Sequence, residues 1–121
     1  MNKPPSMSVV IIGYNTALQL QELLISINNL NTKLDELEVI YIDDGSSDSS
    51  YDMFNNFEME YKKIGKRLSK NVGRAAATQE GILQSSGEWL LFIRSNECFN
   101  ADTLEEYLLA INSNLGLAYM G

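Results

Sequence analysis

One stretch constrains the fold of this chain most: Val39-Ile40-Tyr41-Ile42-Asp43-Asp44-Gly45-Ser46-Ser47-Asp48. Its first four residues are β-branched or aromatic, which predicts a buried strand. The strand stops at two adjacent carboxylates, a glycine and small hydroxyl residues. In an open parallel sheet, ligands bind beyond the carboxyl ends of the strands, so this loop is placed to face a ligand. The same residues also suit a plain turn with a helix cap, and the other strand ends must decide between the two interpretations.

Composition limits the classes of function. At 121 residues, with 45% hydrophobic and 21% charged residues, the chain has the size and composition of one globular domain. Its formal net charge of -7 argues against nucleic-acid binding, which requires a basic face. Most of the basic residues nevertheless cluster, and they form either a solvated face or a place where an anionic ligand is met. They are Lys62, Lys63, Lys66, Arg67, Lys70 and Arg74.

The residue types that are scarce exclude further classes. The sequence has no histidine, which excludes a nucleophile activated by histidine and a zinc site built on histidine. A single cysteine, Cys98, excludes an internal disulfide and fits a reducing compartment. No apolar run suits a signal peptide or reaches transmembrane length. We therefore expect a cytoplasmic protein with no transmembrane segment.

Strand and helix signals alternate along the chain. Short apolar runs predict the strands, and the run over 64–68 is weaker and flanked by lysines, which suits an edge position. This alternation implies an α/β protein with a mostly parallel sheet and helices on both faces. The predicted strands cover 7–12, 39–42, 64–68, 89–93 and 116–120.

Helices are predicted between these strands. Leucine and isoleucine recur at helical spacing over 17–30, and an alanine-rich helix over 74–84 can approach the sheet closely. Two more helices are indicated by a cap residue followed by an apolar face. These signals are Asp48 or Ser49 with Phe54, Phe57 and Tyr61, and Asn100 with Leu104, Leu108 and Ile111.

In a parallel sheet, the loops after about residues 12, 42, 68 and 93 share one edge. They deliver an aromatic ring, a carboxylate pair, a basic residue at a helix N-terminus and a polar last loop. Such a set suits a nucleotide with a phosphate tail, because the ring can stack on a base, a carboxylate can accept from base or ribose, and helix N–H groups can face phosphate. The candidate site residues are Tyr14, Asn15, Asp43, Asp44, Asn71, Arg74, Arg94, Asn96 and Glu97.

Four motifs stand at these strand ends: Val9-Val10-Ile11-Ile12-Gly13-Tyr14-Asn15, the 39–48 stretch, Asn71-Val72-Gly73-Arg74-Ala75-Ala76-Ala77, and Ser86-Gly87-Glu88-Trp89-Leu90-Leu91-Phe92-Ile93. In this order they resemble the N-terminal half of the family 2 glycosyltransferases. That family has the Rossmann-like GT-A fold and transfers a sugar with inversion from a nucleotide diphosphate donor, usually a uridine one. The resemblance covers about residues 7–105. It implies a single donor-binding domain over 1–121, without the family's acceptor half.

The resemblance also implies roles for individual residues. The family's tyrosine-asparagine loop and the second acid of its acid pair hold the uridine. By this match, Tyr14 would lie against the base, Asp44 would accept its ring N–H, and Asp43 would support the loop. Gly13 departs from the family pattern, where a threonine, serine or proline is common.

The fourth loop departs further. The family carries two aspartates there, separated by one residue, which hold a divalent metal and the donor diphosphate. This chain has Arg94-Ser95-Asn96, so Asn96 and Glu97 are the remaining candidates for a Mn²⁺ or Mg²⁺ ligand. Arg94 could instead place its own charge toward the diphosphate, or it could pair with Glu97 or Asp44.

Several interpretations stay open at this point. The chain is a working transferase, alone or completed by a second chain, or a degenerate relative that binds a nucleotide or a partner without turnover. A receiver-type phosphoacceptor domain would need its acid pair after the first strand, and an oxidoreductase would need a glycine-rich fingerprint there. The predicted last strand would leave an edge with which another copy could pair.

Overall fold

The computed structural model describes residues 7–29, 37–95 and 106. Four strands alternate with three helices, as the sequence pattern predicts. Apart from Glu106, the predicted helix after Asn100 lies outside the described residues, and so do the predicted strand at 116–120 and the residues Asn96, Glu97 and Cys98. The elements are β1 (Met7–Gly13), α1 (Ala17–Asn28), β2 (Leu37–Asp43), α2 (Ser50–Asn56), β3 (Lys62–Arg67), α3 (Arg74–Gln84) and β4 (Trp89–Arg94).

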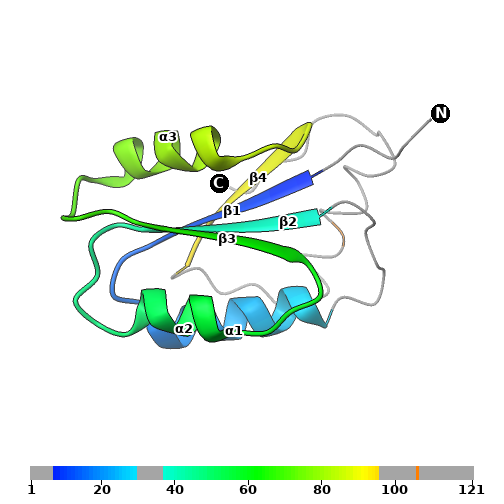
Figure 1. Ribbon diagram of the computed structural model, residues 1–121, viewed down its shortest axis with the longest axis horizontal. Helices are drawn as coiled ribbons and strands as arrows, with labels where there is room; N and C mark the ends of the chain where they lie inside the picture. Colours follow the sequence, from blue (N-terminus) through cyan, green and yellow to red (C-terminus); the bar gives the residue numbers. More distant parts are fainter. Residues whose placement is uncertain (1–6, 30–36, 96–105, 107–121) are drawn as a thin grey trace.

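The four strands form one parallel sheet in the order β3-β2-β1-β4. Helix α3 covers one face, and α1 and α2 cover the other, so the molecule has three layers (Figure 1). This confirms the predicted α/β class with helices on both faces of the sheet. It also confirms that β3 lies at an edge, since it is the outermost of the described strands on its side.

Strands β1 and β2 form the centre of the sheet, and every one of their residues is buried. Alternate residues point to opposite faces, as the period of a strand requires. Val9 and Ile11 face α1, where they meet Leu20, Leu24 and Ile27. Val10, Ile12, Ile40 and Ile42 face α3 and pack with Ala77. Each fully buried aliphatic side chain contributes about 1.5–3 kcal/mol, so these two layers supply much of the driving force for folding.

Helix α3 approaches the sheet closely because its inner face consists of small residues. Ala77 and Gly81 are its buried positions. A Cβ built at Gly81 would fall on Cγ1 of Val10 and would lie 3.5 Å from Cγ1 of Ile42. Glycine at position 81 therefore sets the distance between α3 and the central strands.

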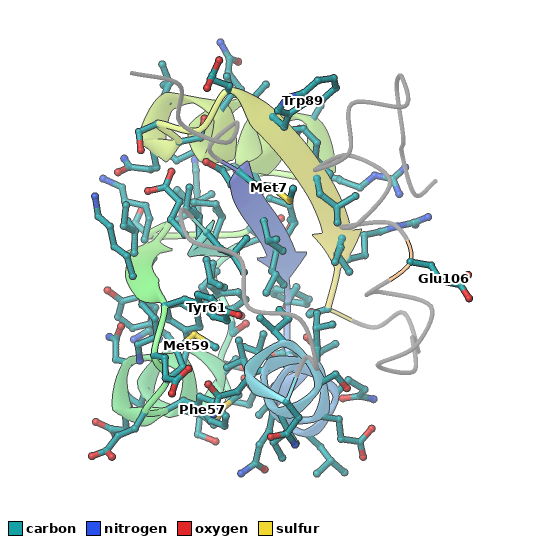
Figure 2. The ribbon with its side chains drawn as sticks, turned by 90° about the vertical axis from the view of Figure 1, so that its right-hand side faces the viewer. Met7, Phe57, Met59, Tyr61, Trp89 and Glu106 are labelled. Carbon is teal, nitrogen blue, oxygen red and sulfur yellow. The ribbon has the colours of Figure 1, made fainter. Side chains whose placement is uncertain are left out.

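The prediction for α2 was partly wrong. Phe54 is buried in this helix, but α2 ends at Asn56, so Phe57 and Tyr61 are not helical. Both still pack against the core as parts of the connection to β3 (Figure 2). Lys63 Nζ donates to the carbonyl oxygens of Phe54, Asn55 and Phe57, which satisfies the carbonyl groups at the end of the helix.

A buried polar network lies at the amino ends of the strands. Glu38 is 6% exposed, and its Oε2 accepts hydrogen bonds from Ser8 Oγ at 2.6 Å and from the Ser86 N–H at 2.7 Å. Ser8 Oγ in turn accepts from the Gly87 N–H at 2.9 Å. Burial raises the pKa of Glu38, but these hydrogen bonds and nearby Lys62 outweigh burial and hold the pKa below its ordinary value. The network ties the turn between α3 and β4 to the sheet.

The close packing of α3 predicts an unusual result for Gly81→Ala. Alanine is favoured over glycine in a helix by about 1 kcal/mol, yet here its methyl group would displace Val10. We expect the free energy of unfolding to fall by about 1–3 kcal/mol, measured by urea denaturation. Gln79→Ala, at an exposed position of the same helix, is the control and should not lower it. A Gly81→Ala variant as stable as the parent would contradict this packing.

The Glu38 network predicts a stability contribution that depends on pH. Since the folded pKa is lowered, the contribution is present above the ordinary value of 4.5 and is lost as pH falls through the folded pKa. Glu38→Gln should therefore lower the free energy of unfolding by about 1–3 kcal/mol near pH 7 and by less near pH 3. Urea denaturation at both pH values tests this, with exposed Glu22→Gln as control. An effect of equal size at both pH values would count against it.

Candidate active site

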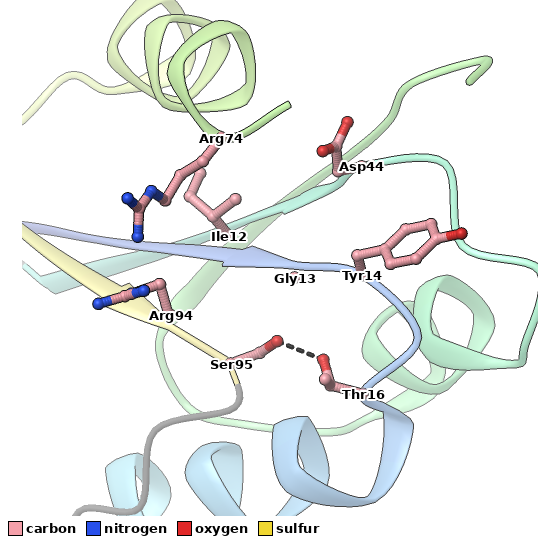
Figure 3. Close-up of a pocket in the computed structure, with 8 residues that line it drawn as sticks. All are labelled: Ile12, Gly13, Tyr14, Thr16, Asp44, Arg74, Arg94 and Ser95. Atoms are coloured by element: carbon pink, nitrogen blue, oxygen red, sulfur yellow. Dashed lines mark hydrogen bonds between the residues drawn. The ribbon is translucent and has the colours of Figure 1, made fainter. Parts of the chain in front are cut away.

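A pocket of about 280 Å³ lies at the carboxyl ends of the parallel strands. It brings together four of the candidate residues, Tyr14, Asp44, Arg74 and Arg94, from four different loops or element ends. Three further candidates, Asn15, Asp43 and Asn71, do not line it. Among the described residues, the lining consists of Ile12, Gly13, Tyr14, Thr16, Asp44, Arg74, Arg94 and Ser95 (Figure 3).

Asn15 joins the first two loops instead of lining the pocket. It adopts a left-handed backbone conformation, with a φ of 52°, which asparagine tolerates better than most residues. Its Oδ1 accepts from the N–H groups of Ser47 at 2.8 Å and Asp48 at 3.2 Å. Its own N–H donates to Ser46 Oγ at 2.8 Å. The side chain therefore holds the loop after β2 against the loop after β1.

Asp43 lies beneath the same loop and is fully buried. Its Oδ1 accepts from the Tyr41 hydroxyl at 2.7 Å, and its Oδ2 accepts from the Ser46 N–H at 2.9 Å. Burial and the neighbouring Asp43 carboxylate raise the pKa of Tyr41 well above its ordinary value, so this tyrosine remains a donor. The first acid of the pair is thus part of the loop's foundation.

Asp44 both lines the pocket and holds the loop that precedes α3. Its Oδ1 accepts from the Val72 N–H at 2.8 Å, and its Oδ2 accepts from the Gly73 N–H at 3.1 Å. The two loops approach so closely at Gly45, which has a φ of 78°, that a Cβ there would lie 2.5 Å from the Lys70 carbonyl carbon. These contacts fix the backbone immediately before Arg74, the first residue of α3.

The pocket has two chemically different ends. Tyr14, which is 47% exposed, presents its ring on one side, near Asp44. Arg74, from the start of α3, and Arg94, from the end of β4, extend to the side away from Tyr14 (Figure 3). Two cations and one carboxylate make this lining positive, although the whole chain carries a net charge of -7. The pocket therefore favours an elongated ligand with a planar ring and an anionic tail.

Asp48 stabilises the start of both helices beneath the pocket. Its Oδ2 accepts from the Ala17 N–H at 3.3 Å, and its Oδ1 accepts from the Ser50 N–H at 3.0 Å. Burial raises the pKa of Asp48, but the hydrogen bonds from Ser50 and Ala17 together outweigh it and lower the pKa overall. The prediction that Asp48 or Ser49 caps α2 holds in this form: Ser49 occupies the cap position, and the Asp48 carboxylate makes the bond.

Potential metal ligands do not cluster among the described residues. No group of three or more potential ligands among them lies close enough together to hold a metal ion. Asp44, the one carboxylate among the described lining residues, already accepts two backbone N–H groups, and Arg74 and Arg94 are cations. The candidate ligands Asn96 and Glu97 lie outside the described residues. In the described part of the chain, no helix combines the length and hydrophobicity needed to cross a membrane.

Sequence reasoning missed four residues of the lining. Ile12 and Gly13 end β1, Thr16 precedes α1, and Ser95 follows β4. Ile12 read as core and Thr16 as loop, so neither gave a signal of its own. Gly13 and Ser95 did give one, since each lies within a motif that departs from the family pattern.

The parallel α/β sheet with a polar pocket at its carboxyl edge has the architecture of the GT-A fold. The model of the family described as Glycosyl transferase family 2 matches residues 8–120. The chain therefore belongs to glycosyl transferase family 2, which confirms the resemblance.

Curated relatives support this membership. The chain is 32% identical over 108 residues to EpsH of Bacillus subtilis (strain 168), a protein described as a glycosyltransferase. The matched segment covers 86% of this chain and 30% of EpsH. The chain is 30% identical over 99 residues to the poly(ribitol-phosphate) beta-glucosyltransferase of Bacillus spizizenii, spanning 80% of this chain and 16% of that enzyme. The chain thus matches less than a third of the length of either relative.

Solved structures share the fold. TarS of S. aureus, crystallised in complex with UDP-GlcNAc, superposes with a TM-score of 0.76 at 26% identity, covering 89% of this chain and 31% of TarS. The mannosyltransferase PcManGT of Pyrobaculum calidifontis, solved with GDP-Man and Mn²⁺, superposes with a TM-score of 0.78 at 21% identity, covering 88% of this chain and 32% of that one. The second comparison supports the fold alone.

The geometry of Asn15 predicts the outcome of two substitutions. Asn15→Gly removes the acceptor of the Ser47 and Asp48 N–H groups but tolerates the positive φ, whereas Asn15→Ala also strains the backbone. We expect losses in the free energy of unfolding of about 1 kcal/mol for glycine and about 2 kcal/mol for alanine. Chemical denaturation measures both, with exposed Asn56→Ala as the control. Equal stability of all three variants would show that Asn15 does not hold the loops.

Proposed function

We propose that this chain is the donor-binding domain, over residues 1–121, of a glycosyltransferase that takes a sugar from a nucleotide diphosphate, with uridine as the base. One observation carries the proposal: the pocket places Tyr14 and Asp44 at one end and Arg74 and Arg94 at the other. A volume of about 280 Å³ is close to the lower limit for ligand pockets, so it suits the base and diphosphate better than a whole nucleotide sugar. The acceptor is then bound by residues outside this pocket.

At the base end, Tyr14 offers a partly exposed ring against which uracil can lie. Asp44 can accept the ring N–H of the base. Its two oxygens each accept one backbone N–H, and a carboxylate oxygen can accept a second hydrogen bond. Because the loops of Asp44 are already fixed, binding requires little reordering, which preserves affinity.

At the phosphate end, Arg74 and Arg94 supply the positive charge that the family obtains from a divalent metal. Guanidinium groups remain charged near neutral pH, and they pair with phosphate oxygens through charge-assisted hydrogen bonds. TarS, at 26% identity, has been crystallised with UDP-GlcNAc, which supports a uridine donor for this chain. We propose that the diphosphate lies between the two arginines.

In the transfer itself, an acceptor oxygen would attack the anomeric carbon as the bond from that carbon to the β-phosphate oxygen breaks. Attack from the opposite face inverts the anomeric centre, and the acceptor proton passes to a base outside the described residues. Negative charge develops on the departing diphosphate, so Arg74 and Arg94 would stabilise the transition state more than the ground state. Their contribution would therefore appear in the rate as well as in donor affinity.

Arg94 stands where the family carries a metal-binding aspartate, and this departure from the family pattern also supports a second candidate function. A chain that binds the nucleotide without turnover would keep both ends of the pocket but lack the acceptor base. Such a protein would bind uridine diphosphate as tightly as an active transferase would. Release of the sugar to water or to an acceptor distinguishes the two functions.

Calorimetric titration of uridine diphosphate, once with Mn²⁺ and once with a chelator, tests the proposal. We expect binding in both conditions, and we expect Arg74→Ala and Arg94→Ala each to weaken it about tenfold or more, because each removes a charged hydrogen bond. Lys70→Ala, an exposed cation outside the lining, is the matched control. Binding that requires Mn²⁺ would contradict the arginine-based phosphate site. No binding at millimolar concentration would exclude the donor site altogether.

A further inference from the structure

Thr16 and Ser95 share a hydrogen bond between their side-chain hydroxyl groups across the pocket floor (Figure 3). Thr16 is the N-cap residue of α1, a position where threonine usually bonds to the helix N–H groups. Here its side chain makes no capping bond, and the Asp48 carboxylate accepts the Ala17 N–H instead. The hydroxyl of Thr16 is therefore directed to another element, the end of β4.

Ser95 is held from two directions. Its N–H donates to the carbonyl oxygen of Ile12 at 2.9 Å, which continues the pairing of β4 with β1 by one residue. Its side chain bonds to Thr16, and the residue is 1% exposed. These two bonds fix the backbone directly after Arg94, which is itself paired with Ile12 of β1.

Gly13 provides the space for this arrangement. A Cβ built at Gly13 would fall on Ser95 Oγ and would lie 3.0 Å from both Ser95 Cβ and Tyr41 Cε1. Tyr41 is fully buried and bonded to Asp43, so it cannot move aside. Any side chain at position 13 would therefore displace Ser95.

We propose that the Thr16–Ser95 hydroxyl pair is a positioning device that directs Arg94 toward the diphosphate, with Gly13 leaving the space it needs. The proposal rests on the proposed function and deepens it. Thr16 and Ser95 act through Arg94 and need not touch the ligand. It explains why glycine stands at position 13 of a chain whose fourth loop carries arginine, since the glycine permits the bond that orients the arginine.

A double-mutant cycle tests the proposal. Thr16→Val and Ser95→Ala each remove one hydroxyl with little change of volume. We expect each to weaken uridine diphosphate binding about three- to tenfold, and the double variant to weaken it no further than either single one. Affinity for uridine, which lacks phosphate, should fall less than affinity for uridine diphosphate does. Ser26→Ala, whose hydroxyl bonds to the Glu22 carbonyl oxygen within α1, is the matched control and should leave both affinities unchanged.

A second comparison separates positioning from direct contact. If the pair acts through Arg94, Arg94→Ala should cost much less affinity in the Ser95→Ala background than in the parent. Additive effects of Thr16→Val and Ser95→Ala, or equal losses for uridine and uridine diphosphate, would overturn the proposal in favour of direct contacts or a general loss of structure. Thermal denaturation of each variant provides the stability reference.

The outcomes distinguish this inference from the proposed function. If the parent chain binds uridine diphosphate and Arg94→Ala weakens binding, but Ser95→Ala does not, the positioning role is wrong and the donor site stands. If the parent chain does not bind uridine diphosphate, the proposed function fails, and this inference fails with it.

Discussion

Side-chain oxygens that accept backbone N–H groups hold the carboxyl edge of this sheet together. Asn15 takes two such groups from the loop after β2, Asp43 takes one within that loop, and Asp44 takes two from the loop before α3. Asp48 takes one from the start of each helix on the other face. The N–H groups of loops lack the hydrogen bonds that join neighbouring strands, so these side-chain oxygens accept them instead. The pocket has a defined shape because three loops are joined in this way.

This arrangement changes how the family's acidic and amide residues are understood in this chain. Asp43 and Asn15 support the loops, whereas Asp44 has two functions, since it orders the residues before Arg74 and faces the pocket. Loss of Asp44 would therefore disturb the phosphate end as well as the base end. The Thr16–Ser95 bond provides the corresponding support for Arg94. The position of Arg74 thus depends on Asp44, and that of Arg94 on the Thr16–Ser95 pair.

The sequence predicted the layers of the fold well, because continuous apolar runs and helical spacing report burial directly. It failed at α2, where Phe57 and Tyr61 keep helical spacing but the helix ends at Asn56. Lys63, which satisfies the last carbonyl groups, is seven positions beyond the helix, and no local pattern links the two. In the site, residue types predicted which loops meet at the pocket but not which side chains face it. The Gly13–Ser95 contact depends on the register of β1 against β4, which one sequence does not contain.

We propose that the pocket binds a uridine diphosphate with its base at Tyr14 and Asp44 and its phosphates at the two arginines. A crystal structure of the chain grown with uridine diphosphate and a chelator tests this most directly. We expect a base against the Tyr14 ring and a diphosphate within hydrogen-bond distance of Arg74 and Arg94. A nucleotide bound in the reverse orientation, or a diphosphate that contacts neither arginine, would contradict it.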